Sequence, residues 1–137
     1  MNNACPKQYL EVLGKPLLQH TLEKLLALPV FARVVIAADA DDPLLQKIIA
    51  CLPAAQQNLI HVVAGGDVRA ASVNNALQAL ADDAQSTDWI LVHDAVRPCV
   101  RLTDIKILIQ ELQEEPAGGL LAVPVRDTIK RIEEGPY

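Results

Sequence analysis

The sequence is short of aromatic side chains and of basic charge, and each shortage excludes a class of protein. Aromatic residues make up 3% of the 137 residues, although 51% are hydrophobic. A core built from Leu, Ile, Val and Ala suits parallel strands covered by helices better than an aromatic-rich β-sandwich. The net charge of −5 argues against a nucleic-acid partner, because phosphate backbones are bound by basic faces.

Cysteine and long apolar runs are also scarce. The three cysteines, Cys5, Cys51 and Cys99, are odd in number and have no metal-ligand spacing. We therefore expect reduced thiols in a cytoplasmic protein. No apolar run is long enough to cross a bilayer, so we expect no membrane-spanning segment, and we expect no signal peptide. The length suits one domain, 1–137.

Strand-like and helix-like apolar patterns alternate along the chain. This alternation predicts an α/β fold, a Rossmann-like three-layer sandwich with a mostly parallel sheet, in which the last strand extends out of the body. Strands are expected at 33–38, 60–63, 89–92, 120–125 and 127–132, and helices at 16–28, 43–51, 69–81 and 103–112.

The stretch 89–98 is the centre of the predicted sheet. Four apolar residues, 89–92, run directly into His93 and Asp94, and Arg97 follows. This pattern predicts a strand buried on both faces, with Asp94 and Arg97 at the edge where open α/β sheets bind ligands. Such a carboxylate suits a metal ion and such a guanidinium suits an anion; the alternative is a structural ion pair. His93 is interpreted as a hydrogen-bonded core residue.

A glycine pair provides a second candidate binding element. Gly65 and Gly66 lie between the expected strand 60–63 and the expected helix 69–81. Backbone amides in such a loop approach a ligand closely, and the helix N-terminus attracts anions. Ser72, one turn into the helix, can point its hydroxyl back toward the loop. The alternative is a tight turn in which Asp67 caps the helix.

Residue spacing alone does not decide the role of Lys7. It follows Pro6 in a polar segment, and it is either a solvated surface lysine or a phosphate-binding lysine held in place by Pro6 and a packed Tyr9. The charged cluster at 126–131 is similarly either a solvated ribbon or a group that reaches a phosphate or a second subunit.

Four motifs together resemble the 2-C-methyl-D-erythritol 4-phosphate cytidylyltransferase family over essentially the whole chain. They are Pro6-Lys7-Gln8-Tyr9, Gly65-Gly66-Asp67-Val68-Arg69 with Ser72, Val92-His93-Asp94-Ala95-Val96-Arg97-Pro98, and the segment 123–131. The resemblance implies transfer of CMP from CTP to methylerythritol phosphate with release of pyrophosphate, with Mg²⁺ as cofactor. The alternatives are a ribitol-5-phosphate cytidylyltransferase, which shares two of these motifs, and a non-catalytic nucleotide-binding or dimerisation module.

The resemblance also implies roles for individual residues. Lys7 and Asp94 are the implied catalytic residues, and Lys7 would contact the triphosphate. Asp94 would lie beside the ribose, the metal and the substrate. Cytosine and ribose recognition falls to Gly66, Asp67 and Ser72, and methylerythritol phosphate would be contacted by Asp94, Ala95, Arg97 and Thr128. The family is a homodimer in which Thr128 is supplied across the interface by a β-arm, here starting in about 126–137.

Two family features are missing from this sequence. The family begins with an apolar strand and a Gly-rich loop, and it continues beyond the position of Tyr137 with the rest of the arm and a further catalytic lysine. The resemblance therefore implies a single nucleotidyltransferase domain, 1–137, that is incomplete at both ends, and a chain that is inactive as it stands.

Overall fold

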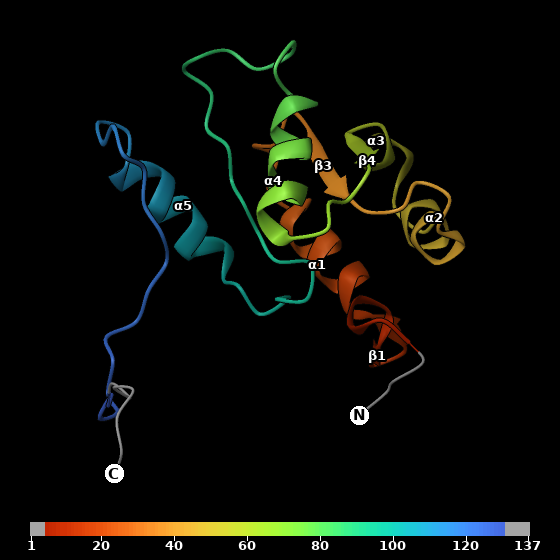
Figure 1. Cartoon of the computed structure of the whole chain (residues 1–137), viewed down its shortest axis with the longest axis horizontal. Coiled ribbons are helices and arrows are strands. Elements are labelled where there is room, and N and C mark those ends of the chain that lie inside the picture. Colours follow the sequence, from red (N-terminus) through yellow and green to blue (C-terminus); the bar gives the residue numbers. More distant parts are fainter. Residues whose placement is uncertain (1–4, 131–137) are drawn as a thin grey trace. The chain divides into compact units, whose positions relative to one another are not determined.

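The computed structural model describes residues 5–130 and falls into two compact units, one ending at Leu102 and the other beginning at Thr103 (Figure 1). The first unit contains one 3₁₀ helix, four strands and four helices among its described residues. In chain order these are η1 (Lys7–Tyr9), β1 (Glu11–Val12), β2 (Lys15–Pro16), α1 (Leu17–Leu25), β3 (Val34–Ala37), α2 (Pro43–Ala50), α3 (Ala54–Gln57), β4 (Ile60–Val63) and α4 (Arg69–Gln78).

The strands β3 and β4 form a parallel pair, as the sequence predicted for 33–38 and 60–63. Val34 lies opposite Ile60, and the register continues to Ala37 opposite Val63. Because side chains alternate along a strand, Val34 and Ile36 share one face. Both pack against the core formed by α1 and α2. The strand β3 also contacts α4, so helices from different parts of the chain cover this parallel pair.

The helices α1 and α2 supply most of the core. Leu18 and Leu22 are spaced one helical turn apart on α1, and Leu45 and Ile48 face them from α2. The start of α2 is fixed by Asp42, whose carboxylate accepts hydrogen bonds from the Leu44 and Leu45 amides at 2.9 and 3.4 Å. Pro43 occupies the first helical position, where its missing N–H costs nothing.

A tight hairpin precedes α1. The strands β1 and β2 are antiparallel, with Val12 opposite Lys15, so the loop consists of Leu13 and Gly14. Both loop residues have positive φ, 52° and 75°, which is the signature of a type I′ turn. Gly14 adopts this conformation freely, whereas Leu13 is strained there and is 94% exposed.

Two of the predicted strands, 89–92 and 120–125, are wrong, and a third, 127–132, is not formed by its described residues 127–130. Residues 89–92 and 120–125 have no strand structure, and their apolar side chains, such as Trp89, Val92 and Val123, are exposed. A strand needs a neighbour to accept its backbone hydrogen bonds, and neither segment pairs with another part of residues 5–130. The apolar pattern is present, but within residues 5–130 no strand lies beside it to pair with.

The second unit is built around α5, Leu102–Glu111, which confirms the helix predicted at 103–112. Ile105 is its most buried residue, at 1% exposure. Residues 127–130 do not form the strand that was predicted there, and the rest of the expected arm, 131–137, lies outside the described residues. No helix within residues 5–130 is long and apolar enough to cross a membrane.

Candidate active site

The glycine loop lies at the carboxyl end of β4, beside the end of β3. The Gly66 amide donates a hydrogen bond to the Ser72 hydroxyl, at 2.9 Å, so Ser72 turns back to the loop as its position predicted. A Cβ at Gly66 would lie 3.0 Å from the Ser72 backbone nitrogen and closer still to the Ala71 side chain. Only glycine therefore fits between the loop and the first turn of α4.

The helix α4 begins without a side-chain cap. Its N-cap residue is Val68, which makes no capping hydrogen bond, so the alternative prediction that Asp67 caps the helix is wrong. Asp67 is exposed, and its carboxylate makes no hydrogen bond or ion pair with other residues of 5–130. The first backbone amides of α4 therefore have no side-chain acceptor and remain able to bind an anion or a polar group.

Asp94 is held between two arginines. Its Oδ1 pairs with the Arg69 guanidinium, and its Oδ2 lies 2.7 Å from Arg97 Nε. The Arg97 amide also donates to the Asp94 carbonyl at 3.2 Å, which closes a turn over 94–97. Because Arg69 is the first residue of α4, this pairing brings Asp94 to the uncapped helix end and the glycine loop.

A buried threonine fixes the same turn from the other side. Thr21 on α1 is 3% exposed, and its hydroxyl donates to the Ala95 carbonyl at 2.8 Å. The backbone of the turn is thus anchored on α1, while its Asp94 side chain pairs with Arg69 of α4. Sequence reasoning missed both anchors. Arg69 belonged to a recognised motif, but nothing local indicated which carboxylate it would meet, and Thr21 carried no signal.

The three charged side chains of this cluster differ in their exposure to solvent. The Asp94 side chain is 19% exposed, whereas those of Arg69 and Arg97 are 69% and 76% exposed. Two guanidiniums and one carboxylate leave a local excess of positive charge that faces solvent. The guanidinium ends of both pairs are exposed, so an anion can reach them from solvent.

His93 lies next to this cluster and is half-buried. Burial lowers the pKa of its imidazole, which favours the neutral ring at neutral pH. Its Nδ1 is buried and has no hydrogen-bond partner among residues 5–130, so the prediction of a hydrogen-bonded core histidine is wrong for this atom.

Two of the predicted site residues are not joined to this cluster by any described contact. Lys7 is exposed in η1, and its ammonium group makes no hydrogen bond or ion pair with residues 5–130. Thr128 belongs to the second unit. Tyr9, two residues beyond Lys7, is packed in the core, as one of the two interpretations of Lys7 required.

The carboxylates fit a metal ion only in part. Residues 5–130 contain no group of three or more His, Cys, Asp or Glu side chains that could hold a metal ion. Mg²⁺ is commonly held by one or two carboxylates together with substrate phosphates and waters. The carboxylate of Asp94 is the type of ligand that such a site uses.

A cavity elsewhere in the first unit contains none of the predicted site residues. Its volume is about 360 Å³, and it lies among η1, the β1–β2 hairpin, α1 and α2. Cys5 and Cys51 line it, and neither forms a disulfide within residues 5–130. The candidate site is therefore the surface around Asp94 and the glycine loop.

The fold and the site define an α/β protein with a Rossmann-like parallel core and a cationic binding edge. The family model for 2-C-methyl-D-erythritol 4-phosphate cytidylyltransferase (IspD) matches residues 1–136. The chain belongs to this family. A solved structure titled 4-diphosphocytidyl-2C-methyl-D-erythritol synthase is similar with a TM-score of 0.80 and 34% identity, over 93% of this chain and 59% of that one. This similarity confirms the predicted fold class.

Curated relatives with the name 2-C-methyl-D-erythritol 4-phosphate cytidylyltransferase agree. The protein of Vibrio vulnificus (strain YJ016) is 50% identical over 126 residues, which are 92% of this chain and 52% of the relative. The protein of Pseudomonas putida (strain W619) is 48% identical over 129 residues, 93% of this chain and 53% of the relative. The chain thus spans about half the length of the curated relatives it matches.

Proposed function

We propose that the protein transfers a cytidylyl group from CTP to 2-C-methyl-D-erythritol 4-phosphate. An oxygen of the substrate phosphate attacks the α-phosphorus of CTP, the bond from that phosphorus to the β-phosphate oxygen breaks, and pyrophosphate leaves. The observation that carries this proposal is the family match over residues 1–136, together with relatives of that name. None of the reported relatives bears the name of the ribitol-5-phosphate enzyme.

The cytidine end of the site is proposed to be the glycine loop. The close fit of Gly66 against α4 holds the loop backbone at a fixed place, and the Ser72 hydroxyl accepts a hydrogen bond of 2.9 Å from the Gly66 amide. Fixed donors and acceptors distinguish the amino group of cytosine from the carbonyl of uracil. The unpaired Asp67 carboxylate is proposed to bind the nucleoside, where it can accept hydrogen bonds.

The sugar-phosphate end is proposed to be the Asp94–Arg97 turn, including the backbone of Ala95. A phosphate oxygen competes with Asp94 for Arg97, and the displaced carboxylate is then able to accept hydrogen bonds from ligand hydroxyls. The 76% exposure of the Arg97 side chain supports this exchange, because it leaves the guanidinium accessible to a phosphate.

Charge on the triphosphate is proposed to be neutralised by Lys7 and by a divalent cation. Lys7 is exposed and unpaired within residues 5–130, which suits a residue that waits for an anion. Mg²⁺ held by Asp94 and phosphate oxygens would supply further charge neutralisation when bound. Lys7 and Asp94 are thus the residues to which we assign the chemistry.

The partner subunit in this proposal is a second copy of the protein. Thr128 and the arm starting at about 126–137 are proposed to reach the substrate of the other copy, in a homodimer. Sedimentation equilibrium of the full-length protein tests this assembly, and a monomer that is fully active would contradict it.

The proposed activity is tested with the purified full-length protein, CTP, Mg²⁺ and 2-C-methyl-D-erythritol 4-phosphate. The expected result is pyrophosphate release that matches formation of the cytidine diphosphate product, followed by ³¹P NMR. D-ribitol 5-phosphate replaces the substrate in one control, and UTP replaces CTP in another. Equal or faster turnover of ribitol phosphate would favour the ribitol enzyme. CTP binding without pyrophosphate release from either substrate would favour the non-catalytic module.

A further inference from the structure

The turn that carries Lys7 is too short to hold its own shape. The 3₁₀ helix η1 spans three residues and is closed by two hydrogen bonds, from the Tyr9 amide to the Pro6 carbonyl (3.0 Å) and from the Leu10 amide to the Lys7 carbonyl (3.2 Å). Isolated helical turns are unstable because a costly nucleus gains few bonds. The conformation around Lys7 must therefore be imposed by contacts of its neighbours.

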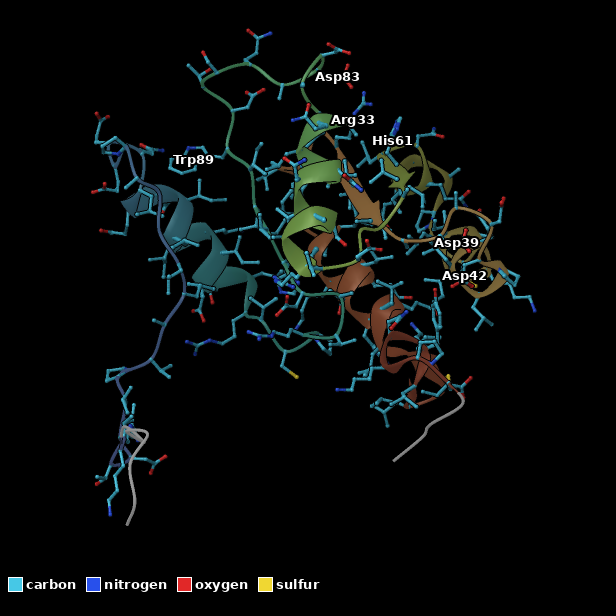
Figure 2. The ribbon with its side chains drawn as sticks, in the orientation of Figure 1. Arg33, Asp39, Asp42, His61, Asp83 and Trp89 are labelled. Atoms are coloured by element: carbon cyan, nitrogen blue, oxygen red, sulfur yellow. The ribbon has the colours of Figure 1, made fainter. Side chains whose placement is uncertain are left out.

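Tyr9 makes those contacts. Its ring is 8% exposed and lies in the core cluster with residues of α1 and α2. Its hydroxyl donates a hydrogen bond of 2.5 Å to Asp42 Oδ2, which lies 33 positions further along the chain. Figure 2 shows Asp42 next to Asp39 at the start of α2. Tyr9 thus connects η1 to a different helix.

The other end of this connection is also fixed. Asp42 uses Oδ1 to cap α2, accepting hydrogen bonds from the Leu44 and Leu45 amides, and uses Oδ2 for Tyr9. A carboxylate that already accepts two backbone hydrogen bonds has little rotational freedom left. The tyrosine hydroxyl therefore meets an acceptor whose position is set by the backbone of α2.

We propose that Tyr9 and Asp42 are positioning residues for Lys7, holding the turn so that the lysine ammonium reaches the triphosphate in the reaction. This inference rests on the proposed function. The Lys7 side chain has no partner of its own within residues 5–130, so the position of its backbone decides where its flexible stem can reach. Small displacements of a charge aimed at a transition state are costly in rate.

The raised pKa of Tyr9, about 12, agrees with this role. Burial is its main cause, and the hydrogen bond to Asp42 adds to it. The hydroxyl therefore stays protonated and able to donate throughout the pH range in which such an enzyme works. The same hydrogen bond is the main cause of the lowered pKa of Asp42, which stays ionised and able to accept.

The test is a double-mutant cycle in the full-length protein with Tyr9→Phe and Lys7→Ala. Tyr9→Phe keeps the buried ring and removes only the hydroxyl. We expect kcat to fall roughly tenfold with little change in KM for CTP, and we expect no further fall when Tyr9→Phe is added to Lys7→Ala. Asp42→Asn, which still caps α2 and accepts a hydrogen bond, should keep most of the activity.

A matched control separates positioning from stability. Gln57→Leu removes another partly buried side-chain hydrogen bond, from Gln57 Nε2 to the Leu52 carbonyl at 2.7 Å, far along the chain from Lys7. It should lower the melting temperature but leave kcat unchanged. If Tyr9→Phe behaves like Gln57→Leu, or if its effect on kcat persists in the Lys7→Ala background, the positioning role is wrong.

Amide hydrogen exchange keeps the inference separate from the proposed function. In Tyr9→Phe, the backbone amides at positions 9 and 10, which close η1, should exchange at least tenfold faster than in wild type. The exchange rates of the α4 amides should not change. Unchanged exchange in η1 would overturn the inference whether or not CTP is turned over. A wild-type protein without CTP turnover would overturn the proposed function, and the exchange rates would still decide whether Tyr9 holds the Lys7 turn.

Discussion

At the scale of single residues, the arginines at Asp94 differ in what they are expected to do. Arg69 leads α4 and pairs with one carboxylate oxygen, whereas Arg97 closes the 94–97 turn and pairs with the other. In the proposed reaction only Arg97 binds the sugar phosphate. Sequence alone placed Asp94 and Arg97 together but left Arg69 without a partner, because that pairing joins two distant parts of the chain.

Arg97→Ala should raise KM for methylerythritol phosphate by roughly 10- to 100-fold and KM for CTP much less, because a charge-assisted hydrogen bond to one ligand is lost. Steady-state kinetics with each substrate varied in turn provide the measurement. Arg33→Ala is the control: Arg33 pairs with Asp83 and His61 near β3 and β4 (Figure 2), away from any predicted site residue. Equal increases in both KM values would place Arg97 elsewhere in the site.

Tyr9 also makes stability depend on alkaline pH. Its pKa is raised from 10.0 to about 12, so the folded state favours the protonated hydroxyl more than the unfolded state does. The stabilisation is complete below the unfolded pKa and is lost as the pH rises toward the folded one. Between about pH 10 and about pH 12, the free energy of unfolding in urea should fall more steeply for wild type than for Tyr9→Phe. Parallel pH profiles would contradict this linkage.

At the scale of elements, the two neighbouring glycines of the glycine loop differ in the space available to a side chain. A Cβ at Gly66 would press on the backbone of Ser72 and the side chain of Ala71, whereas one at Gly65 would find its nearest neighbours at 3.9 Å. Gly66→Ala should therefore lower the free energy of unfolding by about 1–3 kcal/mol and weaken CTP binding, while Gly65→Ala should change stability by less than about 0.5 kcal/mol. Urea unfolding and calorimetric CTP titration are the measurements. Similar losses for both variants would show that the loop, not the close approach, is responsible.

The β1–β2 hairpin offers the opposite case, an element that a substitution should stabilise. Leu13 has φ of 52° and is 94% exposed, so it carries left-handed strain without compensating burial. Leu13→Asn creates the Asn-Gly pair that type I′ turns favour, and it should raise the free energy of unfolding by up to about 1 kcal/mol. Leu13→Ala, which keeps the strain, is the control. A melting temperature that rises equally in both variants would point to loss of the exposed leucine instead.

The sequence predicted those elements whose signal is local. The β-branched run at 33–38, the Asp42-Pro43 helix start and the glycine loop with Ser72 all carry their own information, and each was confirmed. The strands at 89–92 and 120–125 were wrong because strand formation depends on a neighbour that the segment itself cannot specify. The four-residue helix α3 was missed for the related reason that it is shorter than any periodic pattern. Asp67 was a plausible cap by residue type, yet Val68 takes that position.

At the scale of the whole molecule, the apolar side chains outside the core are the feature that sequence and structure describe most differently. The sequence pattern of 89–92 indicates a strand covered on both faces. In the structure Trp89, Ile90 and Val92 are each about half exposed, at 47%, 46% and 55%. Both descriptions concern the same segment that leads into Asp94, so the conformation of this segment also decides how firmly the candidate site is held.

Trp89 provides the measurement, because it is the only tryptophan in the sequence. At 47% exposure its fluorescence in the 137-residue chain should lie toward the red and should be quenched by acrylamide about half as strongly as in urea, which serves as the fully exposed reference. A blue-shifted emission that resists quenching would mean that 89–92 is a covered strand, as its apolar pattern indicates. That outcome would contradict the described conformation of the segment and would favour a more rigid support for Asp94.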